Sequence, residues 1–244
     1  LKERVKAAGP FESKEQREIF AAVIWLDDAV GRVVQELEET GLAENTIIVL
    51  VSDHERYPKM TCNMGKTTLI VSGKGIKPGV VDTLVSTVDI VPTILDLTGS
   101  KVDEGAFDGR SFRAALEGNP AEIQDSIYQE ITYTRAVATK EWKYIAQRFP
   151  EEIQAKITPE NRRDYNQEGT TYSVGDSNLA RVRYHSDKKF PGYYDDDQLY
   201  NLTKDPREQN NLASDPEYAA KLAEMQEKLR AYCQDLPHRF GEFK

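Results

Sequence analysis

The side chains best suited to chemistry are an adjacent carboxylate and imidazole, Asp53 and His54. They directly follow the apolar run 47–51, whose β-branched residues predict a short strand buried on both faces, as in a parallel sheet. Open α/β sheets bind ligands at the carboxyl ends of their strands, so both side chains could face one cation or one oxyanion. A capping Asp53 beside a hydrogen-bonded surface His54 fits the spacing equally well, and the spacing leaves both interpretations open.

Two further groups of charged residues could bind a ligand. His185 stands among arginines and lysines at positions 181, 183, 188 and 189, and this basic setting could contact an anionic substrate. Three consecutive aspartates at 195–197 could hold a cation, although such a run is usually a solvated turn.

The elements that must position these residues alternate between helix and strand. Apolar residues recur every three to four positions from Ser13 to about Thr40 and predict a long amphipathic helix, with a Ser13–Gln16 capping box and Gly41 as its C-terminal cap. A short strand is predicted at 68–71 and a helix at 87–98. This order predicts an α/β fold.

The second half of the chain has a different pattern. Glycines and a proline break the stretch 105–120, and we place a domain boundary there, with domains at 1–118 and 119–244. Alternating residues predict antiparallel strands at 126–131, 135–139 and 143–145, an irregular insertion follows at 151–189, and 216–233 predicts a terminal helix. The expected second domain is therefore a small α+β domain.

Composition excludes several classes of protein. The 244 residues carry 32 basic and 41 acidic side chains, a formal net charge of −9 that disfavours nucleic-acid binding. No uncharged apolar run approaches the roughly 20 residues that cross a bilayer, so no membrane span is expected. Cys62 and Cys233 are too few for a disulfide framework or a zinc knuckle.

Several segments, taken together and in order, resemble the sulfatase family of the alkaline phosphatase superfamily, and the pattern is most similar to bacterial sulfatases of the heparan N-sulfatase type. These segments are LDDAVGR at 26–32, GLAENTIIVLVSDH at 41–54, VSTVDIVPTILDLTG at 85–99, DGRSF at 108–112, QLYNL at 198–202, DPRE at 205–208 and NNLA at 210–213. The resemblance implies the C-terminal part of an alkaline-phosphatase-like α/β sandwich, followed by a smaller α+β domain with a short antiparallel sheet and a C-terminal helix.

The resemblance also implies roles for individual residues. In the family, the residues matching Asp53 and His54 help to hold a divalent cation, usually calcium, which binds the sulfate oxygens. An imidazole suits zinc better than calcium, so His54 is also a candidate for contact with the sulfate or the nucleophile. A family lysine binds sulfate a few positions later; Thr61 aligns best with it here, which makes Lys59, then Lys66, the candidate replacements.

Other matches and departures bear on activity. His238 and Arg239 resemble a closing segment of some bacterial sulfatases that reaches the pocket rim. The family has Gly where Glu55 stands, and its nucleophile is a formylglycine made in a C-x-P/A-x-R motif, which neither cysteine here fits. In the family that motif lies upstream of the segment matching Leu1, so we expect a C-terminal portion without the nucleophile, inactive by itself.

The function implied by the resemblance is hydrolysis of sulfate esters or sulfamates, with sugars as the expected substrates, in a periplasmic or extracellular setting. Two alternatives stay open. A phosphodiesterase or phosphatase of the same superfamily would hold zinc at Asp53 and His54. A non-catalytic pseudo-enzyme would bind sulfated glycans without turnover, and Glu55 and Thr61 favour it.

Overall fold

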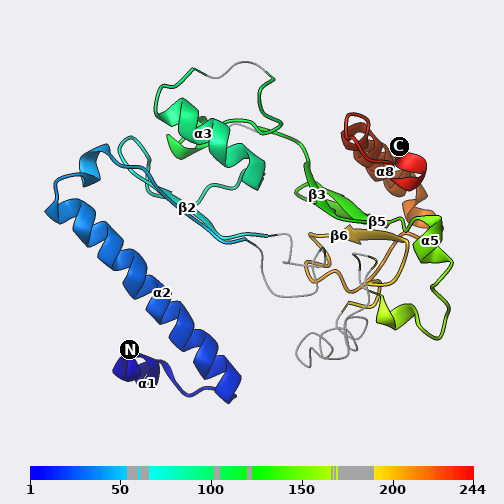
Figure 1. Ribbon diagram of the computed structural model, residues 1–244, viewed down its shortest axis with the longest axis horizontal. Helices are drawn as coiled ribbons and strands as arrows, with labels where there is room; N and C mark the ends of the chain where they lie inside the picture. Colours follow the sequence, from blue (N-terminus) through cyan, green and yellow to red (C-terminus); the bar gives the residue numbers. More distant parts are fainter. Residues whose placement is uncertain are drawn as a thin grey trace. The chain divides into compact units, whose positions relative to one another are not determined.

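The computed structural model describes residues 1–53, 60, 66–101, 105–119, 123–165, 167, 169 and 190–244. These residues form two compact units, one of 1–50 with 70–76 and the other of 51–69 with 77–244 (Figure 1). The domain boundary near residue 118 stays a prediction.

The first unit begins with two helices, α1 (Lys2–Ala8) and the long α2 (Lys14–Glu39). The Ser13 side chain accepts a hydrogen bond from the Gln16 amide at 3.0 Å, and the Gln16 side chain accepts one from the Glu12 amide at 2.7 Å. At the other end Gly41 has a φ of +72°, which lets the Leu42 amide donate back to the Leu37 carbonyl at 2.8 Å. The predicted helix and both of its end signals are confirmed.

The apolar face of α2 lies largely in solvent. Ile24 is its one buried residue, while Ile19, Val23, Leu26 and Val33 are 49–58% exposed. Phe20, Val30, Val34 and Leu37 are partly buried. In its own unit the helix packs on α1 and on the single turn η1 (Ala43–Asn45), which are too short to cover 26 residues. The amphipathic pattern therefore forms the helix without burying its apolar face.

Two short strands, β1 (Ile48–Val51) and β2 (Leu69–Ser72), form a two-stranded sheet. They run antiparallel, because Ser52 after β1 bonds to Thr68 before β2, while Gly73 after β2 packs on Thr46 before β1. The expectation of a strand buried on both faces of a parallel sheet is wrong for β1, whose residues are partly buried or exposed. Apolar residues alone do not bury a strand when no layer in the described chain covers it.

In the second unit a buried carboxylate fixes the start of a helix. The turn η2 (Thr87–Asp89) leads into α3 (Ile90–Leu97), and Asp89 is fully buried. Its carboxylate accepts hydrogen bonds from the Ser86 amide at 2.7 Å, the Arg110 amide at 2.8 Å and the Gln124 side chain at 2.9 Å. The predicted helix at 87–98 is confirmed, and its first turn is bonded to two later segments.

The turn 108–112 lies directly against this helix. The Phe112 amide donates to Thr93 Oγ1 at 3.0 Å, and the Ser111 hydroxyl donates to the Asp96 carboxylate at 2.6 Å. Gly109 lies so close to the turn before α3 that a Cβ atom there would be 2.1 Å from the Val88 carbonyl oxygen. The short helix α4 (Arg113–Leu116) follows. The two sequence segments at 85–99 and 108–112 thus form one packed structure.

A four-stranded antiparallel sheet organises the rest of the unit, in the order β3 (Ile127–Ile131), β4 (Thr134–Ala138), β5 (Trp142–Gln147) and β6 (Asp197–Asn201). The first three strands confirm the predicted ones. Sequence periodicity missed β6, because only its three central residues are buried and a long segment separates it from β5.

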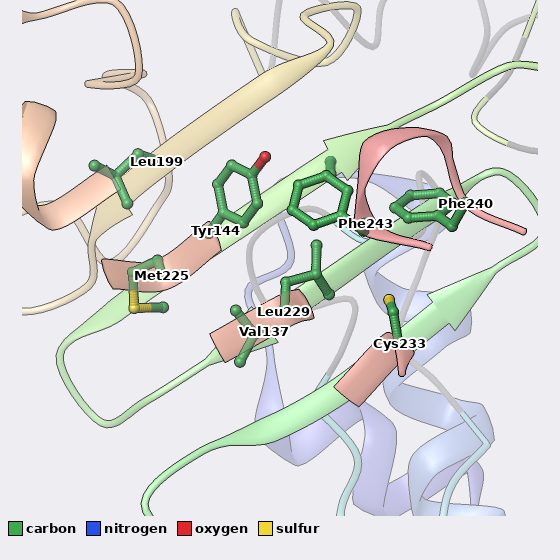
Figure 2. Close-up of a cluster of buried hydrophobic side chains, with 9 residues drawn as sticks. Val137, Tyr144, Leu199, Met225, Leu229, Cys233, Phe240 and Phe243 are labelled. Atoms are coloured by element: carbon green, nitrogen blue, oxygen red, sulfur yellow. The ribbon is translucent and has the colours of Figure 1, made fainter. Parts of the chain in front are cut away.

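Helix α8 (Ala219–Cys233) follows the single turn η4 (Pro216–Tyr218) and covers one face of the sheet, as predicted. Pairing across the strands aligns Val137, Tyr144 and Leu199 in one row. Figure 2 shows this row facing α8, with the C-terminal phenylalanines beside it. The buried cluster consists of Val137, Tyr144, Ala146, Leu199, Met225, Leu229, Cys233, Phe240 and Phe243.

The remaining described elements are short. The predicted irregular insertion contains a helix α5 (Glu151–Gln154) and a turn η3 (Arg162–Asp164), and the turn η5 (Gly241–Phe243) ends the chain. None of the helices in the described residues is long and apolar enough to cross a membrane.

We predict that Gly109→Ala lowers the stability of the second unit by about 2 kcal/mol or more, because overpacking against fixed backbone cannot relax cheaply. Urea unfolding followed by circular dichroism measures the change. Gly79→Ala is the matched control, because a Cβ there meets nothing within 4 Å, and it should stay within about 0.5 kcal/mol of the parent. Equal midpoints for the two variants would contradict the close packing of the turn on α3.

Candidate functional site

The structure brings two of the predicted site residues to one end of the two-stranded sheet. The Ser52 amide donates to the Thr68 carbonyl at 3.1 Å, and the Thr68 amide donates to the Ser52 hydroxyl at 2.8 Å. Asp53 directly follows Ser52, and Lys66 lies two positions before Thr68. Both side chains are exposed. A carboxylate and an ammonium group therefore flank the same pair of hydrogen bonds.

Three other predicted residues, His54, Lys59 and His185, lie outside the described residues. His238 is exposed in the turn between α8 and η5. The buried Phe240 and Phe243 hold the backbone that follows it, and the described contacts do not connect His238 with Asp53 or Lys66. Its predicted role at the pocket rim stays a prediction.

A complete metal site is not present within the described part of the chain. No group of three His, Cys, Asp or Glu side chains comes together there. Asp53 offers one exposed carboxylate, the ligand type that hard cations such as calcium prefer, while structural calcium sites use six to eight oxygens. The described residues therefore fit a cation only as one contributor among several.

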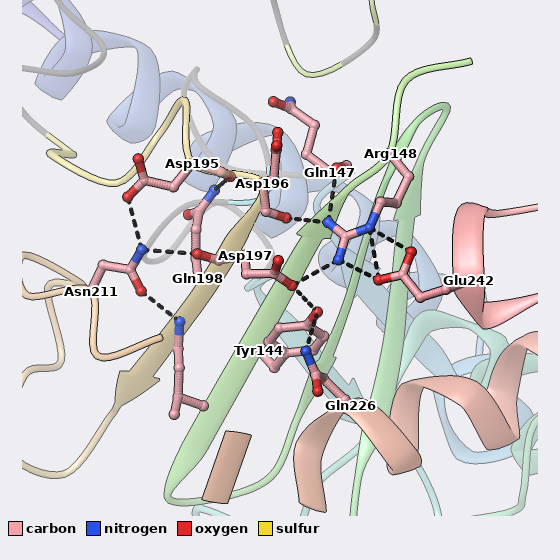
Figure 3. A network of polar contacts seen from close by, with 11 residues as sticks. Tyr144, Gln147, Arg148, Asp195, Asp196, Asp197, Gln198, Asn211, Gln226 and Glu242 are labelled. Atoms are coloured by element: carbon pink, nitrogen blue, oxygen red, sulfur yellow. Dashed lines mark hydrogen bonds and ion pairs between the residues drawn. The ribbon is translucent and has the colours of Figure 1, made fainter. Parts of the chain in front are cut away.

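The aspartates at 195–197 mostly serve structural bonds (Figure 3). Asp197 accepts from the Tyr144 hydroxyl and from the Arg148 guanidinium, the latter at 2.8 Å, and Asp195 accepts from the Asn211 amide at 2.8 Å. The run lines a surface hollow of about 570 Å³ together with Tyr194, Asn211, Ala213 and Ser214. Two of its three carboxylates are thus already paired, which argues against a cation site built from all three.

Arg148 links this group to the end of the chain. It binds the Glu242 carboxylate at 2.7–3.1 Å, and its guanidinium lies 5.4 Å from the centre of the Phe243 ring. These bonds to two carboxylates raise the pKa of Arg148, outweighing the opposing effect of burial, so the guanidinium stays charged. The network attaches the C-terminal segment to β5 and β6.

A buried ion pair between Lys143 and Glu208 lies in the same unit as Asp53 and Lys66, and sequence reasoning missed it. Lys143 Nζ is 3.0 Å from Glu208 Oε1, and the two side chains are only 6% and 5% exposed. The ammonium also donates to the Met60 carbonyl at 2.9 Å. The available signal was a lysine inside the apolar strand at 142–147, together with a glutamate ending the DPRE segment.

The environment of this pair changes how Glu208 binds protons. Burial raises the pKa of Glu208, and the charges of Lys143 and, more weakly, Lys66 act in the opposite direction without cancelling the effect.

Comparison with known proteins identifies relatives of this chain among the sulfatases. Residues 5–100 match the sulfatase family model. The chain is 30% identical over 217 residues to an ulvan-active sulfatase of Formosa agariphila, covering 84% of this chain and 35% of that protein. It is 25% identical to an N-acetylglucosamine-6-O-sulfatase of Bacteroides thetaiotaomicron, over 87% of this chain and 34% of that protein.

A solved structure of a putative sulfatase from Bacteroides thetaiotaomicron shares the fold with a TM-score of 0.61 at 23% identity, over 91% of this chain and 44% of that one. The chain spans about a third of the length of the curated relatives it matches.

We predict a specific pH dependence for Glu208. Since its pKa in the folded chain is raised above the ordinary value of about 4.3, its contribution to stability is complete below that value and is lost as pH rises through the folded pKa. Glu208→Gln keeps an oxygen for Lys143 but cannot titrate. Urea unfolding of both proteins between about pH 4 and 7.5 should therefore show the wild-type advantage shrinking as pH rises. An advantage that grows with pH would mean that Lys143 outweighs burial.

Proposed function

We propose that this chain, a member of the sulfatase family by its match over residues 5–100, forms the C-terminal part of a hydrolase that acts on sulfate esters or sulfamates of sugars. The observation that carries the proposal is the placement of Asp53 and Lys66 at one end of the β1–β2 sheet, within the matched residues.

The relatives support the type of reaction and the kind of substrate. Their names describe sulfatases, and one of them describes a sulfated amino sugar. All share with this chain a segment that spans only about a third of their own length. The largely exposed apolar face of α2 supports a larger assembly, because an uncovered face of this extent favours a further packed layer. We propose that the remaining part of the family fold supplies the layer that covers this face of α2.

The proposed chemistry of the site follows from its charges. Asp53 would supply a carboxylate oxygen to a calcium ion, with His54 as its predicted companion, and calcium would attract the sulfate oxygens. The Lys66 ammonium at the same sheet end would bind the sulfate anion by a charge-assisted hydrogen bond, with Lys59 as the second candidate. We assign the formylglycine nucleophile to a segment upstream of this chain.

The first test of the proposal is calcium binding. We predict that the 244-residue chain binds calcium with a dissociation constant on the order of a millimolar, since most ligands are absent, and that Asp53→Asn weakens it about tenfold or more. Isothermal titration measures the affinity. Asp82→Asn is the matched control, because Asp82 is fully exposed, and it should titrate like the parent.

Two results of this titration would count against the proposal. Equal affinity in Asp53→Asn and Asp82→Asn would remove Asp53 from the cation site. Zinc bound far more tightly than calcium, and lost with Asp53, would support the phosphodiesterase alternative instead.

The second test concerns the nucleophile. The coding sequence upstream of Leu1 should encode a C-x-P/A-x-R or S-x-P/A-x-R motif, and the chain by itself should not turn over an aryl sulfate. Sequencing the gene and assaying the purified chain answer both points. Turnover by this chain alone that Asp53→Ala abolishes would overturn the assignment of the nucleophile to another segment.

A further inference from the structure

The Lys143–Glu208 pair differs from the other ion pairs in the described residues, each of which has at least one partner more than a third exposed. Taking two charges out of water is costly, and well-packed apolar residues of the same volume usually give equal or greater stability. Stability alone therefore does not account for this pair. A part of the chain whose position the two charges fix would account for it.

The position that the pair imposes is that of Met60. Lys143 Nζ holds the Met60 carbonyl at 2.9 Å, and the Met60 side chain is 5% exposed. It packs in a small cluster with Ala136, Ile145 and Tyr200. This cluster includes β4, β5 and β6 residues, and it is separate from the cluster that packs under α8. Met60 is therefore attached to the sheet both by a charged hydrogen bond and by apolar contact.

The glutamate is held equally firmly by the DPRE turn. The Glu208 amide donates to the Asp205 carbonyl at 3.1 Å. The Asp205 side chain in turn accepts from the Gln209 and Asn210 amides at 2.7 and 2.8 Å. This turn directs the Glu208 carboxylate into the interior instead of into solvent.

The backbone is strained at both ends of the charged contact. Met60 has a φ of +64° and Glu208 a φ of +54°, in the left-handed region that residues with a side chain avoid. Such conformations persist only where the surrounding contacts over-determine them, and they cluster at sites with a specific geometric task. Lys143 supplies the shared contact, because its ammonium reaches both residues.

We propose that Lys143 and Glu208 are positioning residues that hold Met60 on the sheet and, through Met60, affect the placement of Asp53 and Lys66. Met60 lies between these two residues in sequence. In this proposal the Lys143 strand and the DPRE turn act on the site through the Met60 carbonyl. The inference rests on the proposed function only in treating Asp53 and Lys66 as site residues.

The test removes both charges while keeping the volume, with the double variant Lys143→Met, Glu208→Leu. We expect a melting temperature close to that of the parent, because an apolar pair replaces the ion pair without an unpaired charge. Cleavage by trypsin after the exposed Lys66 should nevertheless be about tenfold faster, because Met60 is no longer held on the sheet by the Lys143 ammonium. Mass spectrometry of timed digests measures this rate at that one bond.

Lys140→Met is the matched control. It makes the same substitution in the same hairpin, but Lys140 is 45% exposed and donates to the Asp82 carbonyl instead of to Met60. Its cleavage after Lys66 should match that of the parent. A folded double variant that is cleaved after Lys66 at the control rate would overturn the proposal.

A second variant decides the question if the double variant does not fold. Glu208→Gln keeps an oxygen for Lys143 but removes the negative charge, so cleavage after Lys66 should be faster than in the Lys140→Met control. A rate equal to that of Lys140→Met would overturn the proposal.

These measurements stay separate from the test of the proposed function. Trypsin cleavage requires neither cation nor substrate, so failure of the calcium titration would reject the proposed site and leave the positioning role standing. Where the parent binds calcium through Asp53, the double variant should bind it more weakly although Asp53 is intact. An unchanged calcium affinity in the double variant would show that the pair does not position Asp53.

Discussion

A buried ammonium group needs oxygen partners, and in this chain that requirement at Lys143 joins three distant parts of the sequence. The lysine lies on β5, its carboxylate partner comes from the DPRE turn after β6, and its carbonyl partner is Met60. Because an unpaired buried charge is far more costly than a paired one, these three parts must be in place together. The second unit is thereby organised around a contact that links the C-terminal sheet with the segment carrying Asp53 and Lys66.

The same sheet uses its two faces in different ways. On one face the row through Val137, Tyr144 and Leu199 meets α8 and the C-terminal phenylalanines, and this contact is apolar. The alternate residues of the same strands include Lys143 and Gln198, which are buried and polar. Strand alternation therefore supplies a hydrophobic core under α8 on one face, and on the other face buried polar side chains beside the apolar cluster that contains Met60.

A buried polar group also joins separate segments of the chain at α3. Asp89 satisfies its carboxylate with donors from three segments, and Gly109 permits the backbone approach that brings one of them within reach. In the first unit the situation is the opposite, because α2 and the two-stranded sheet retain large exposed apolar side chains. The sugar sulfatases that it matches are about two and a half times as long as this chain, which aligns with about a third of their length.

Local patterns in the sequence determined the helices α2, α3 and α8 and most of the strands, but not the short helices α1, α4 and α5. The three-to-four spacing of apolar residues, Ser13 and Gly41 set the limits of α2, and alternation set β3 to β5, because these signals act between residues close in the chain. The segments that resemble sulfatases made Asp53 a candidate and Lys66 a replacement candidate after Lys59, and the structure places Asp53 and Lys66 near one end of a sheet. The pairing of Lys143 with Glu208, the antiparallel course of β1 and β2, and the exposure of α2 were decided only by tertiary structure. These three features depend on which distant segments are present to pack or to pair. The periodicity of residues along the chain does not contain this information.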